Sequence, residues 1–458
     1  MPSYSWPPVK SLTPSERAPL GWALLYFFCL LTGYYVLRPV RDAMGASDDM
    51  FAVFPQALVD WASGVGIGLQ EFTLQVLFTA TFGCMLLLQP IYGALAARLP
   101  RRIFLPVVYL VFIVCLLGFF LGFDRRLPGR GALFFVWTAV FNLFAVSVFW
   151  SYMADVFDNE SAKKVYGYIG AGGTAGALLG PIITRTLVEE IGVGNLLLVS
   201  AGFLSVCLLC IVRLRPWAQA RERRRRRDGD IGDRAMGGSI LAGLRLIARD
   251  PLLRALAVLM LFGVGCGTLL YNEQAAIVRR FFIDDMARTV YYANIDLAVN
   301  SVAILVQVLL TRALLKRFGI APLIVAPALA ILLGFAVLSA SPFPLFVAVV
   351  QVAMRAGEFS LAKPARETIY TRVSREARYK AKAAIDTVVY RGGDLFFVWL
   401  HKALSVFGSR AVFLAGVAVA VGMTFSAWQV IRGQRRLPGD EQVFPTADAD
   451  IDGPRIDS

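Results

Sequence analysis

Charged residues and histidines are scarce in this sequence of 458 residues. Only 17% of the residues are Asp, Glu, Lys or Arg and 57% are hydrophobic, whereas an average soluble protein is about 25% charged. Disorder requires low hydrophobicity, and a soluble enzyme requires a polar surface, so the composition argues against both classes. The one histidine, His401, excludes a zinc or haem site built from several histidines.

Motifs that carry enzyme chemistry are also missing. The sequence contains no H-E-x-x-H and no G-x-S-x-G, which mark metalloproteases and serine hydrolases. Its six cysteines lie in apolar stretches. Although Cys207 and Cys210 have the spacing of a redox pair, we interpret them as small packing residues. We therefore predict that the protein is not an enzyme and holds no metal and no cofactor.

What the sequence does contain is a series of long apolar windows. A transmembrane helix takes about 20 apolar residues. Such windows occur at 20–37, 73–97, 103–123, 132–156, 165–188, 194–214, 252–278, 288–315, 320–340, 344–368, 381–404 and 409–431. The predicted fold class is all-α: a polytopic membrane protein of about 12 transmembrane helices in two pseudo-symmetric six-helix bundles. Residues 43–71 are half apolar, and whether they form an interfacial helix stays open.

The net charge of +14 would indicate nucleic-acid binding in a soluble protein, but in a membrane protein it marks the cytoplasmic side. Half of it comes from residues 213–249, which hold eleven Arg against four acids. We predict an N-terminal bundle (1–212), a basic cytoplasmic linker (213–250), a C-terminal bundle (251–432) and a disordered acidic tail (433–458). Since basic loops stay in the cytoplasm, we predict a cell inner membrane protein with cytoplasmic termini and no nucleic-acid partner.

The two predicted bundles repeat one another in sequence. Residues 93–102 and 312–319 both resemble the G-x-x-x-D-R-x-G-R-R loop signature of the major facilitator superfamily. Ala97 and Lys316 replace its aspartate, and Pro100 replaces its second glycine. Residues 160–177 and 376–393 also align without gaps. Two related six-helix halves are expected of a transporter that alternates access around a site at mid-membrane.

Charged side chains inside the first predicted span point to such a site. A charge at the bilayer centre costs about 2.5–3.5 kcal/mol on insertion scales, so it should face protein or water. Tyr34, Arg38 and Arg41 follow one helix face by their spacing. Asp42 can take the place of Arg41 on that face, and Pro39 favours a kink beside it. The alternative is that the two arginines only snorkel to the outer interface.

The second half holds more of these charges. In the tenth span Arg355 and Glu358 lie three residues apart and can pair. Lys363 and Arg366 continue their face toward the cytoplasm. The alternative role of such residues is helix–helix attachment, in which a partner neutralises each charge. Further candidates are Glu273 in the seventh span, Asp296 in the eighth, and Asp386, Tyr390, Arg391 and Asp394 in the eleventh.

A glycine stripe in the fifth span is typical of close helix packing. Gly172, Gly176 and Gly180 recur every four residues, which is the small-xxx-small pattern of membrane helices. Residues 170–175 also imitate a dinucleotide-binding fingerprint, but that motif requires a preceding strand and a helix that starts at the phosphates. We therefore predict a packing role for the three glycines.

Several motifs resemble the ATP/ADP translocase (nucleotide antiporter) family and its bacterial relatives, in chain order through both halves. They are Leu37-Arg38-Pro39-Val40-Arg41-Asp42, Phe149-Trp150 with residues 160–167, and Lys363-Pro364-Ala365-Arg366-Glu367 with residues 379–382 and 386–394. The resemblance implies a phosphate-bearing substrate held by Arg38, Arg41, Lys363 and Arg366. The sequence departs from the family early in the fourth span, where Thr138 and Asn142 stand in place of an acid.

We predict a secondary active transporter that moves an anionic, phosphate-bearing metabolite by alternating access, with nucleotide-type antiport or proton coupling. The alternatives are a major-facilitator importer or exporter of a non-nucleotide solute, and a transport-inactive membrane sensor or scaffold. We expect a monomer in the lipid bilayer. The predicted substrate-binding residues are Tyr34, Arg38, Arg41, Asn142, Lys363, Arg366, Tyr390 and Arg391. The predicted coupling or gating charges are Asp42, Glu273, Asp296, Arg355, Glu358, Asp386 and Asp394.

Overall fold

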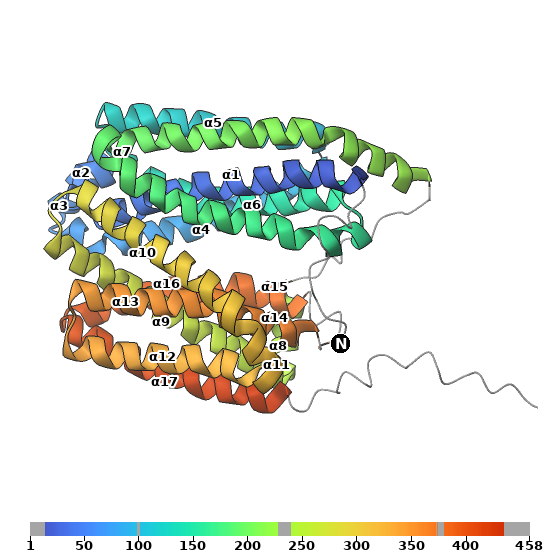
Figure 1. Ribbon diagram of the computed structural model, residues 1–458. Helices are drawn as coiled ribbons and strands as arrows, with labels where there is room; N and C mark the ends of the chain where they lie inside the picture. Colours follow the sequence, from blue (N-terminus) through green and yellow to red (C-terminus); the bar gives the residue numbers. More distant parts are fainter. Residues whose placement is uncertain (1–13, 99–100, 228–239, 372, 374–379, 435–458) are drawn as a thin grey trace, which may run out of the picture.

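The described part of the chain is helical throughout. The computed structural model describes residues 14–98, 101–227, 240–371, 373 and 380–434 (Figure 1), and no strand occurs within these ranges. The tail that we predict at 433–458 lies outside them except for its first two residues.

Five long helices make up the N-terminal half. Their bounds are α1 Pro14–Gly45, α4 Thr73–Arg98, α5 Arg101–Asp124, α6 Arg130–Val156 and α7 Asn159–Arg227. α7 is broken at Gly192, whose φ of 78° is a conformation that glycine adopts without strain. The predicted windows 165–188 and 194–214 fall on the two arms of α7. Residues 43–71 contain short helices: α2 Met50–Val53, α3 Gln56–Gly64 and the 3₁₀ turn η2 Leu69–Phe72.

The C-terminal half has more interruptions. Its helices are α8 Ile240–Arg249, α9 Pro251–Phe281, α10 Asp285–Val306, α11 Arg312–Phe318, α12 Ala321–Ala340, α13 Pro344–Gly357, α14 Lys363–Thr371, α15 Lys382–Ala384, α16 Tyr390–Ser405 and α17 Ser409–Gln434. π-helical turns join several of these helices, among them η3 Gln307–Thr311, η4 Glu358–Ala362 and η6 Ile385–Val389. η4 ends just before Pro364, which has no N–H to donate, and the wider turn accommodates the proline ring.

Ten of the described helices are long and apolar enough to cross a membrane. This number is compatible with twelve spans, because α7 consists of two arms and α15 continues through η6 into α16. Leu86, Leu133 and Leu333 are more than 60% exposed, which suits a surface that faces lipid. The predicted all-α, polytopic membrane fold is confirmed.

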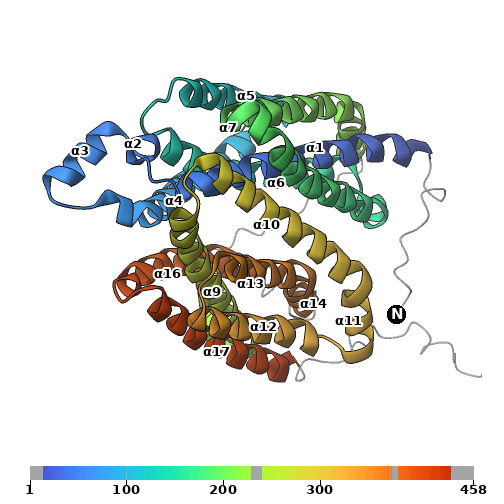
Figure 2. The ribbon, with the colours of Figure 1, turned by 60° about the vertical axis from the view of Figure 1, so that its left-hand side comes forward.

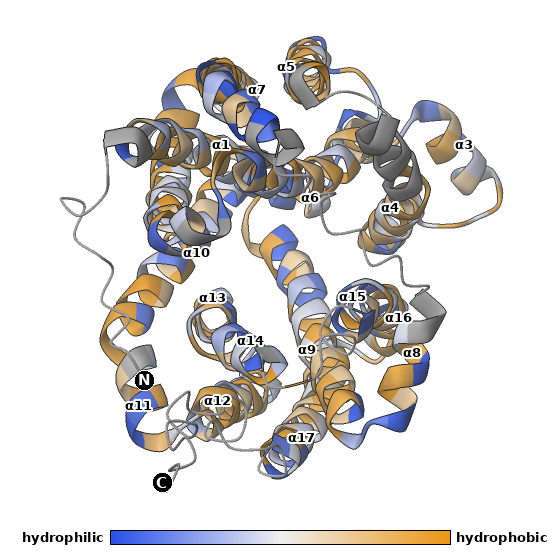
Figure 3. Ribbon diagram, turned by 90° about the vertical axis from the view of Figure 1, so that its right-hand side faces the viewer, coloured by the Kyte–Doolittle hydropathy of each residue, from blue (hydrophilic) through white to orange (hydrophobic). Residues whose placement is uncertain are grey.

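The two halves lie side by side and each has its own apolar core (Figure 2). α10 runs obliquely between them and contacts α1, α7 and α13. We call the end of the bundle where α1 begins and α17 ends the terminal face; it faces the viewer in Figure 3. The opposite end, where α1 ends and α4 begins, is the distal face. A third apolar cluster, which includes Val53, Phe135 and Val278, joins the halves at the distal face.

The basic segment 213–250, which we predict as a linker, is helical at both of its described ends. Arginine is a good helix former, and α7 continues through the arginine run to Arg227. α8 packs on α9 and α15. Asp250 caps α9, because its side chain accepts hydrogen bonds from the N–H groups of Leu252 (2.8 Å) and Leu253 (3.2 Å). α9 thus begins at a defined cap.

Gly172, Gly176 and Gly180 lie against α1. A Cβ at Gly176 would come within 2.3 Å of the carbonyl oxygen of Phe28, and a Cβ at Gly180 within 2.6 Å of the Cβ of Tyr35. Helix backbones this close leave no room for a side chain. The contact fixes α1 on α7, and α1 carries Arg38 and Arg41.

Candidate functional site

A cavity of about 640 Å³ lies between the two halves, within the range of about 300–1,000 Å³ that is usual for small-molecule sites. Its lining runs from Arg41, near the distal end of α1, to Lys382, where α15 begins. α1, α4 and α6 form its N-terminal wall. α9, α12 to α17, η4 and η6 form its C-terminal wall.

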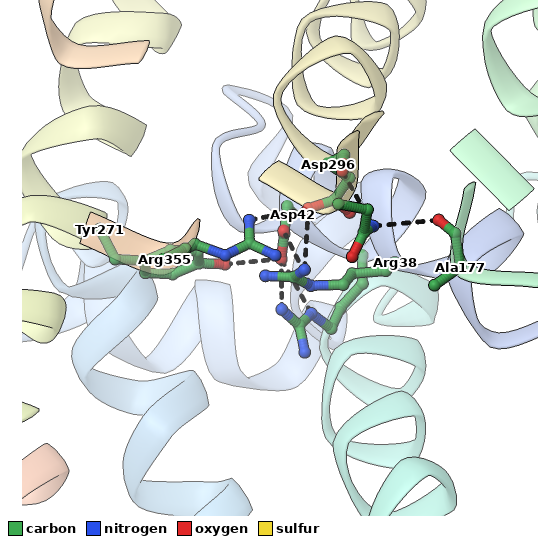
Figure 4. Close-up of polar contacts among 8 residues, drawn as sticks. Arg38, Asp42, Ala177, Tyr271, Asp296 and Arg355 are labelled. Atoms are coloured by element: carbon green, nitrogen blue, oxygen red, sulfur yellow. Dashed lines mark hydrogen bonds and ion pairs between the residues drawn. The ribbon is translucent and has the colours of Figure 1, made fainter. Parts of the chain in front are cut away.

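Asp296 on α10 joins an arginine of the N-terminal half to an arginine of the C-terminal half (Figure 4). Its Oδ1 atom accepts hydrogen bonds from Arg38 on α1 (2.8 Å) and from Arg355 on α13 (2.7 Å). The Asp296 side chain is 2% exposed, and the arginine side chains are 14% and 13% exposed. The other oxygen, Oδ2, and Nη2 of Arg355 are buried without a hydrogen-bond partner among the described residues. Unpaired buried polar atoms are costly, so these two atoms can bind a further group.

Asp42 forms a second centre beside Asp296. It pairs with Arg41 at 2.5 Å and lies 4.0 Å from Arg38. The hydroxyl of Tyr271 on α9 also donates a hydrogen bond to Asp42, at 2.9 Å. Three guanidinium groups therefore share two carboxylates in a site largely closed to solvent, which leaves positive charge in excess.

The charges of the tenth span pair differently from our prediction of an Arg355–Glu358 contact. Arg355 bonds to Asp296, and Glu358 binds both terminal nitrogens of Arg366, with 3.0 Å between Nη1 and Oε2. Such a bidentate pair is strong and fixes both groups. The π-helical turn η4 starts at Glu358 and shifts the residues after it relative to α13. Helix spacing alone could not show this shift.

Among the described residues, no acid lies within ion-pair distance of Lys363. Its side chain lines the cavity and is exposed. No hydrogen bond or ion pair joins it to the described part of the chain; Asp386 acts on it electrostatically without an ion pair within 4 Å. Lys382, in contrast, is held by Glu367 at 2.6 Å. Lys363 is thus available to a ligand.

The start of α16 gives the cavity a further polar patch. Asp394 accepts a hydrogen bond from Thr268 on α9 at 2.8 Å and lies 3.7 Å from Arg391. The guanidinium of Arg391 lies 5.4 Å from the ring centre of Tyr390, which is 38% exposed. These groups lie on the C-terminal wall.

The N-terminal wall is apolar apart from its two arginines and Thr81. α4 and α6 supply Phe78, Phe82, Met85, Phe135 and Ala139. A ligand in the cavity therefore meets aromatic and aliphatic side chains on one side and charged side chains on the other.

Basic groups outnumber acidic groups around the cavity. Among the described residues the lining has seven basic side chains, Arg38, Arg41, Arg355, Lys363, Arg366, Lys382 and Arg391, and four acidic ones, Glu358, Glu367, Asp386 and Asp394. Asp42 and Asp296, which pair with the arginines from behind the wall, bring the acids to six. One positive charge remains in excess.

Ten of the predicted site residues line the cavity: Arg38, Arg41, Arg355, Glu358, Lys363, Arg366, Asp386, Tyr390, Arg391 and Asp394. Asp42 and Asp296 lie directly behind its wall. Tyr34, Asn142 and Glu273 do not line it. Tyr34 packs against the ring of Tyr35, and Glu273 pairs with His401.

Tyr271, Gln351 and Tyr370 also line the cavity, although the sequence did not lead us to them. Gln351 lies one turn before Arg355, so helix spacing could have identified it. Tyr271 reaches Asp42 across 229 positions of sequence. No local pattern shows such a contact.

The family model of the Major Facilitator Superfamily matches residues 23–272. No curated protein sequence matches the chain. Among solved structures, a POT family transporter in complex with a thioalcohol-conjugated peptide is similar, with a TM-score of 0.60 and 13% identity over 89% of this chain and 94% of that one. A D-xylose–proton symporter has a TM-score of 0.60 and 14% identity over 92% and 98% of the two chains. A nucleoside transporter has a TM-score of 0.55 and 12% identity over 91% and 99%. At these identities the likeness shows the fold alone.

Proposed function

The chain belongs to the Major Facilitator Superfamily, whose members are secondary transporters rather than enzymes, and from this premise we propose that it carries a small anionic solute by alternating access. The similar structures are of transporters for a peptide, a sugar and a nucleoside, so the fold does not select a substrate. The selection has to come from the side chains of the cavity.

One observation supports an anion above all: the cavity holds one positive charge in excess, and Lys363 has no acid within ion-pair distance among the described residues. An unneutralised charge inside a membrane protein is costly, and an anionic ligand removes this cost. Arg366, Arg38 and Lys363 line one continuous cavity. Arginine forks and a lysine ammonium are suited to phosphate and carboxylate groups.

The apolar N-terminal wall favours a solute with an organic body as well as a charge. Phe78, Phe82 and Phe135 can contact a ring or a carbon chain while the basic groups bind the anionic end. A phosphate-bearing metabolite, a nucleotide among them, satisfies both conditions. The proposed binding groups are Arg38, Arg41, Lys363, Arg366, Tyr390 and Arg391, and the proposed coupling or gating charges are Asp42, Asp296, Arg355, Glu358, Asp386 and Asp394.

We propose that the terminal face is cytoplasmic and the membrane is the cell inner membrane. The arginine run at the end of α7 lies at this face, and basic segments stay in the cytoplasm. The cavity reaches this face at Lys382, while apolar and polar contacts between the halves occupy the distal face. In this arrangement the described conformation faces the cytoplasm, and the transporter works as a monomer.

Transport in liposomes tests the proposal. The purified protein is reconstituted and loaded with an unlabelled solute, and entry of the labelled solute is followed for inorganic phosphate, glycerol 3-phosphate, AMP, ADP and ATP. We expect exchange of at least one of them. Lys363→Gln should reduce the initial rate at least tenfold, because it removes a cavity-lining cation that pairs with no acid of the described residues.

Lys316→Gln is the matched control, since Lys316 is an exposed lysine on α11 outside the cavity lining. Its rate should equal that of the wild type. Failure of every one of these phosphates to enter would refute the phosphate-bearing substrate, and a normal rate in Lys363→Gln would refute the role of that residue.

A further inference from the structure

A buried acid and the one histidine of the chain form a pair that the transport cavity does not use. Nε2 of His401 on α16 lies 3.0 Å from Oε2 of Glu273 on α9. The two residues are 6% and 2% exposed, and neither lines the cavity. Nδ1 of His401 is buried and has no hydrogen-bond partner among the described residues.

The same stretch of α16 holds the two halves together at the distal face. The carbonyl oxygen of Val398 accepts a hydrogen bond from Gln75 on α4 (3.2 Å), and Nε1 of Trp399 donates to Thr79 on α4 (3.2 Å). Lys402 pairs with Glu71 at 2.7 Å. His401 lies between these residues and points to α9 instead. The pair is thus next to the contacts that must break when the distal face opens.

α16 also forms part of the cavity wall. Asp394 lies seven residues before His401, which is two helical turns or about 10 Å. Asp394 and His401 both contact α9, at Thr268 and Glu273. Between Asp394 and His401, α16 is in tight contact with α9, because a Cβ at Gly265 on α9 would come within 2.5 Å of the ring of Phe397 on α16. A change at His401 therefore acts on a rigid element that reaches from the distal face to the cavity.

The charge of the pair depends on one proton. With protonated His401 the pair is neutral, and with neutral His401 it carries one buried negative charge, which a low-dielectric interior disfavours. Arg280 on α9 and the hydroxyl of Ser409 at the start of α17 act on Glu273. Lys402, on the same helix as His401, is neutralised by Glu71, and α4 presents Gln75 and Thr79. Proton loss should therefore favour a conformation in which water reaches the pair.

We propose that the His401–Glu273 pair is the proton-binding site of this transporter, and that a proton bound there from the distal side favours closure of the distal face. The proposal rests on transport as the function of the chain, but it does not depend on which anion is carried. It assigns the coupling ion as a proton and the coupling element as α16.

A distance measurement that needs no solute tests the site. Spin labels are attached at Ser63→Cys on α3 and Ile283→Cys between α9 and α10, two exposed positions of the distal face, in the full chain with its native cysteines replaced. In the wild-type background the mean distance should increase as the pH rises from about 5 to 8. His401→Gln and Glu273→Gln should remove this pH dependence.

Ser426→Ala is the matched control, because it removes a buried hydroxyl of α17 that bonds within its own helix. It should retain the wild-type pH midpoint. A wild-type distance that does not change with pH would overturn the proposal. An unchanged midpoint in both His401→Gln and Glu273→Gln would also overturn it. Two variants are used so that the test still holds if one of them fails to fold.

A second measurement separates this proposal from the proposed function. In liposomes, acidification on the distal side should raise uptake of an exchanged anion at least fivefold, and His401→Gln should lose this stimulation while retaining exchange without a gradient. Stimulation that survives in His401→Gln would overturn the proton site. If no anion of the set exchanges at all, the proposed function fails, and the solute-free distance measurement still decides on the proton site.

Discussion

At the scale of single residues, the sequence shows which charges are unusual but not which groups they meet. Arg38 and Arg355 attract attention because arginine inside an apolar window is costly. That both bond to one oxygen of Asp296 depends on the crossing of α1, α10 and α13, which brings together residues 258 and 59 positions apart. Spacing rules report only neighbours on one helix, and for this reason they paired Arg355 with Glu358.

Asp296→Asn tests how much the shared carboxylate contributes. The substitution keeps the shape of the side chain but leaves two guanidinium groups facing each other without a charge between them. Removing one partner of a buried ion pair costs about 3–5 kcal/mol. We expect a clearly lower unfolding midpoint for the detergent-solubilised protein in a thermal denaturation experiment. Asp124→Asn, at an exposed position at the end of α5, should leave the midpoint unchanged, and equal midpoints for both variants would contradict this account.

At the scale of elements, the hydropathy windows predicted the long helices well because span length and apolar content are local properties. The window 73–97 became α4 Thr73–Arg98, and 320–340 became α12 Ala321–Ala340. The π-helical turns were not predicted, because they depend on how a whole helix fits its neighbours around the cavity. The helical ends of the segment 213–250 were missed for another reason: a run of arginines was interpreted by its charge and not by its helix propensity.

Gly176→Ala tests the packing of α7 on α1. A Cβ at this position would lie 2.3 Å from the carbonyl oxygen of Phe28, and this backbone atom cannot move away without shifting α1. Overpacking of this kind costs about 1–3 kcal/mol, so the thermal unfolding midpoint should fall. Gly170→Ala on the same helix is the control, since nothing lies within 4 Å of its added Cβ and alanine favours the helix. A midpoint that falls equally in both variants would contradict close packing as the cause.

At the scale of the whole molecule, repetition in the sequence predicted two halves, and the described helices pack around two separate apolar cores. What the sequence could not show is which end of the cavity is closed. The distal face is held by pairs between residues far apart, such as Arg279 and Asp48 at 3.5 Å and Lys402 and Glu71 at 2.7 Å. Arg288, which is 1% exposed, also contacts Asp48. These contacts depend on how the two halves meet, which no local pattern in the sequence shows.

Asp48→Asn should therefore open the distal face. Asp48 lies on the N-terminal half between Arg279 and Arg288 of the C-terminal half. Its loss removes their ion pairs to the N-terminal half, whereas Arg288 keeps its pair with Asp285 of its own half at 3.3 Å. Hydrogen bonds to charged groups contribute about 1.5–3 kcal/mol, and a change of 1.4 kcal/mol shifts a population about tenfold.

We expect an impermeant thiol reagent added on the distal side to alkylate a cysteine at Phe78, in the cavity wall, about ten times faster than without the Asp48 change. Glu71→Gln removes a more exposed pair, which is worth less, and should increase the rate by a smaller factor. Asp60→Asn, at an exposed position of α3, should not change it. An equal rate in all four proteins would mean that the distal ion pairs do not hold this face closed.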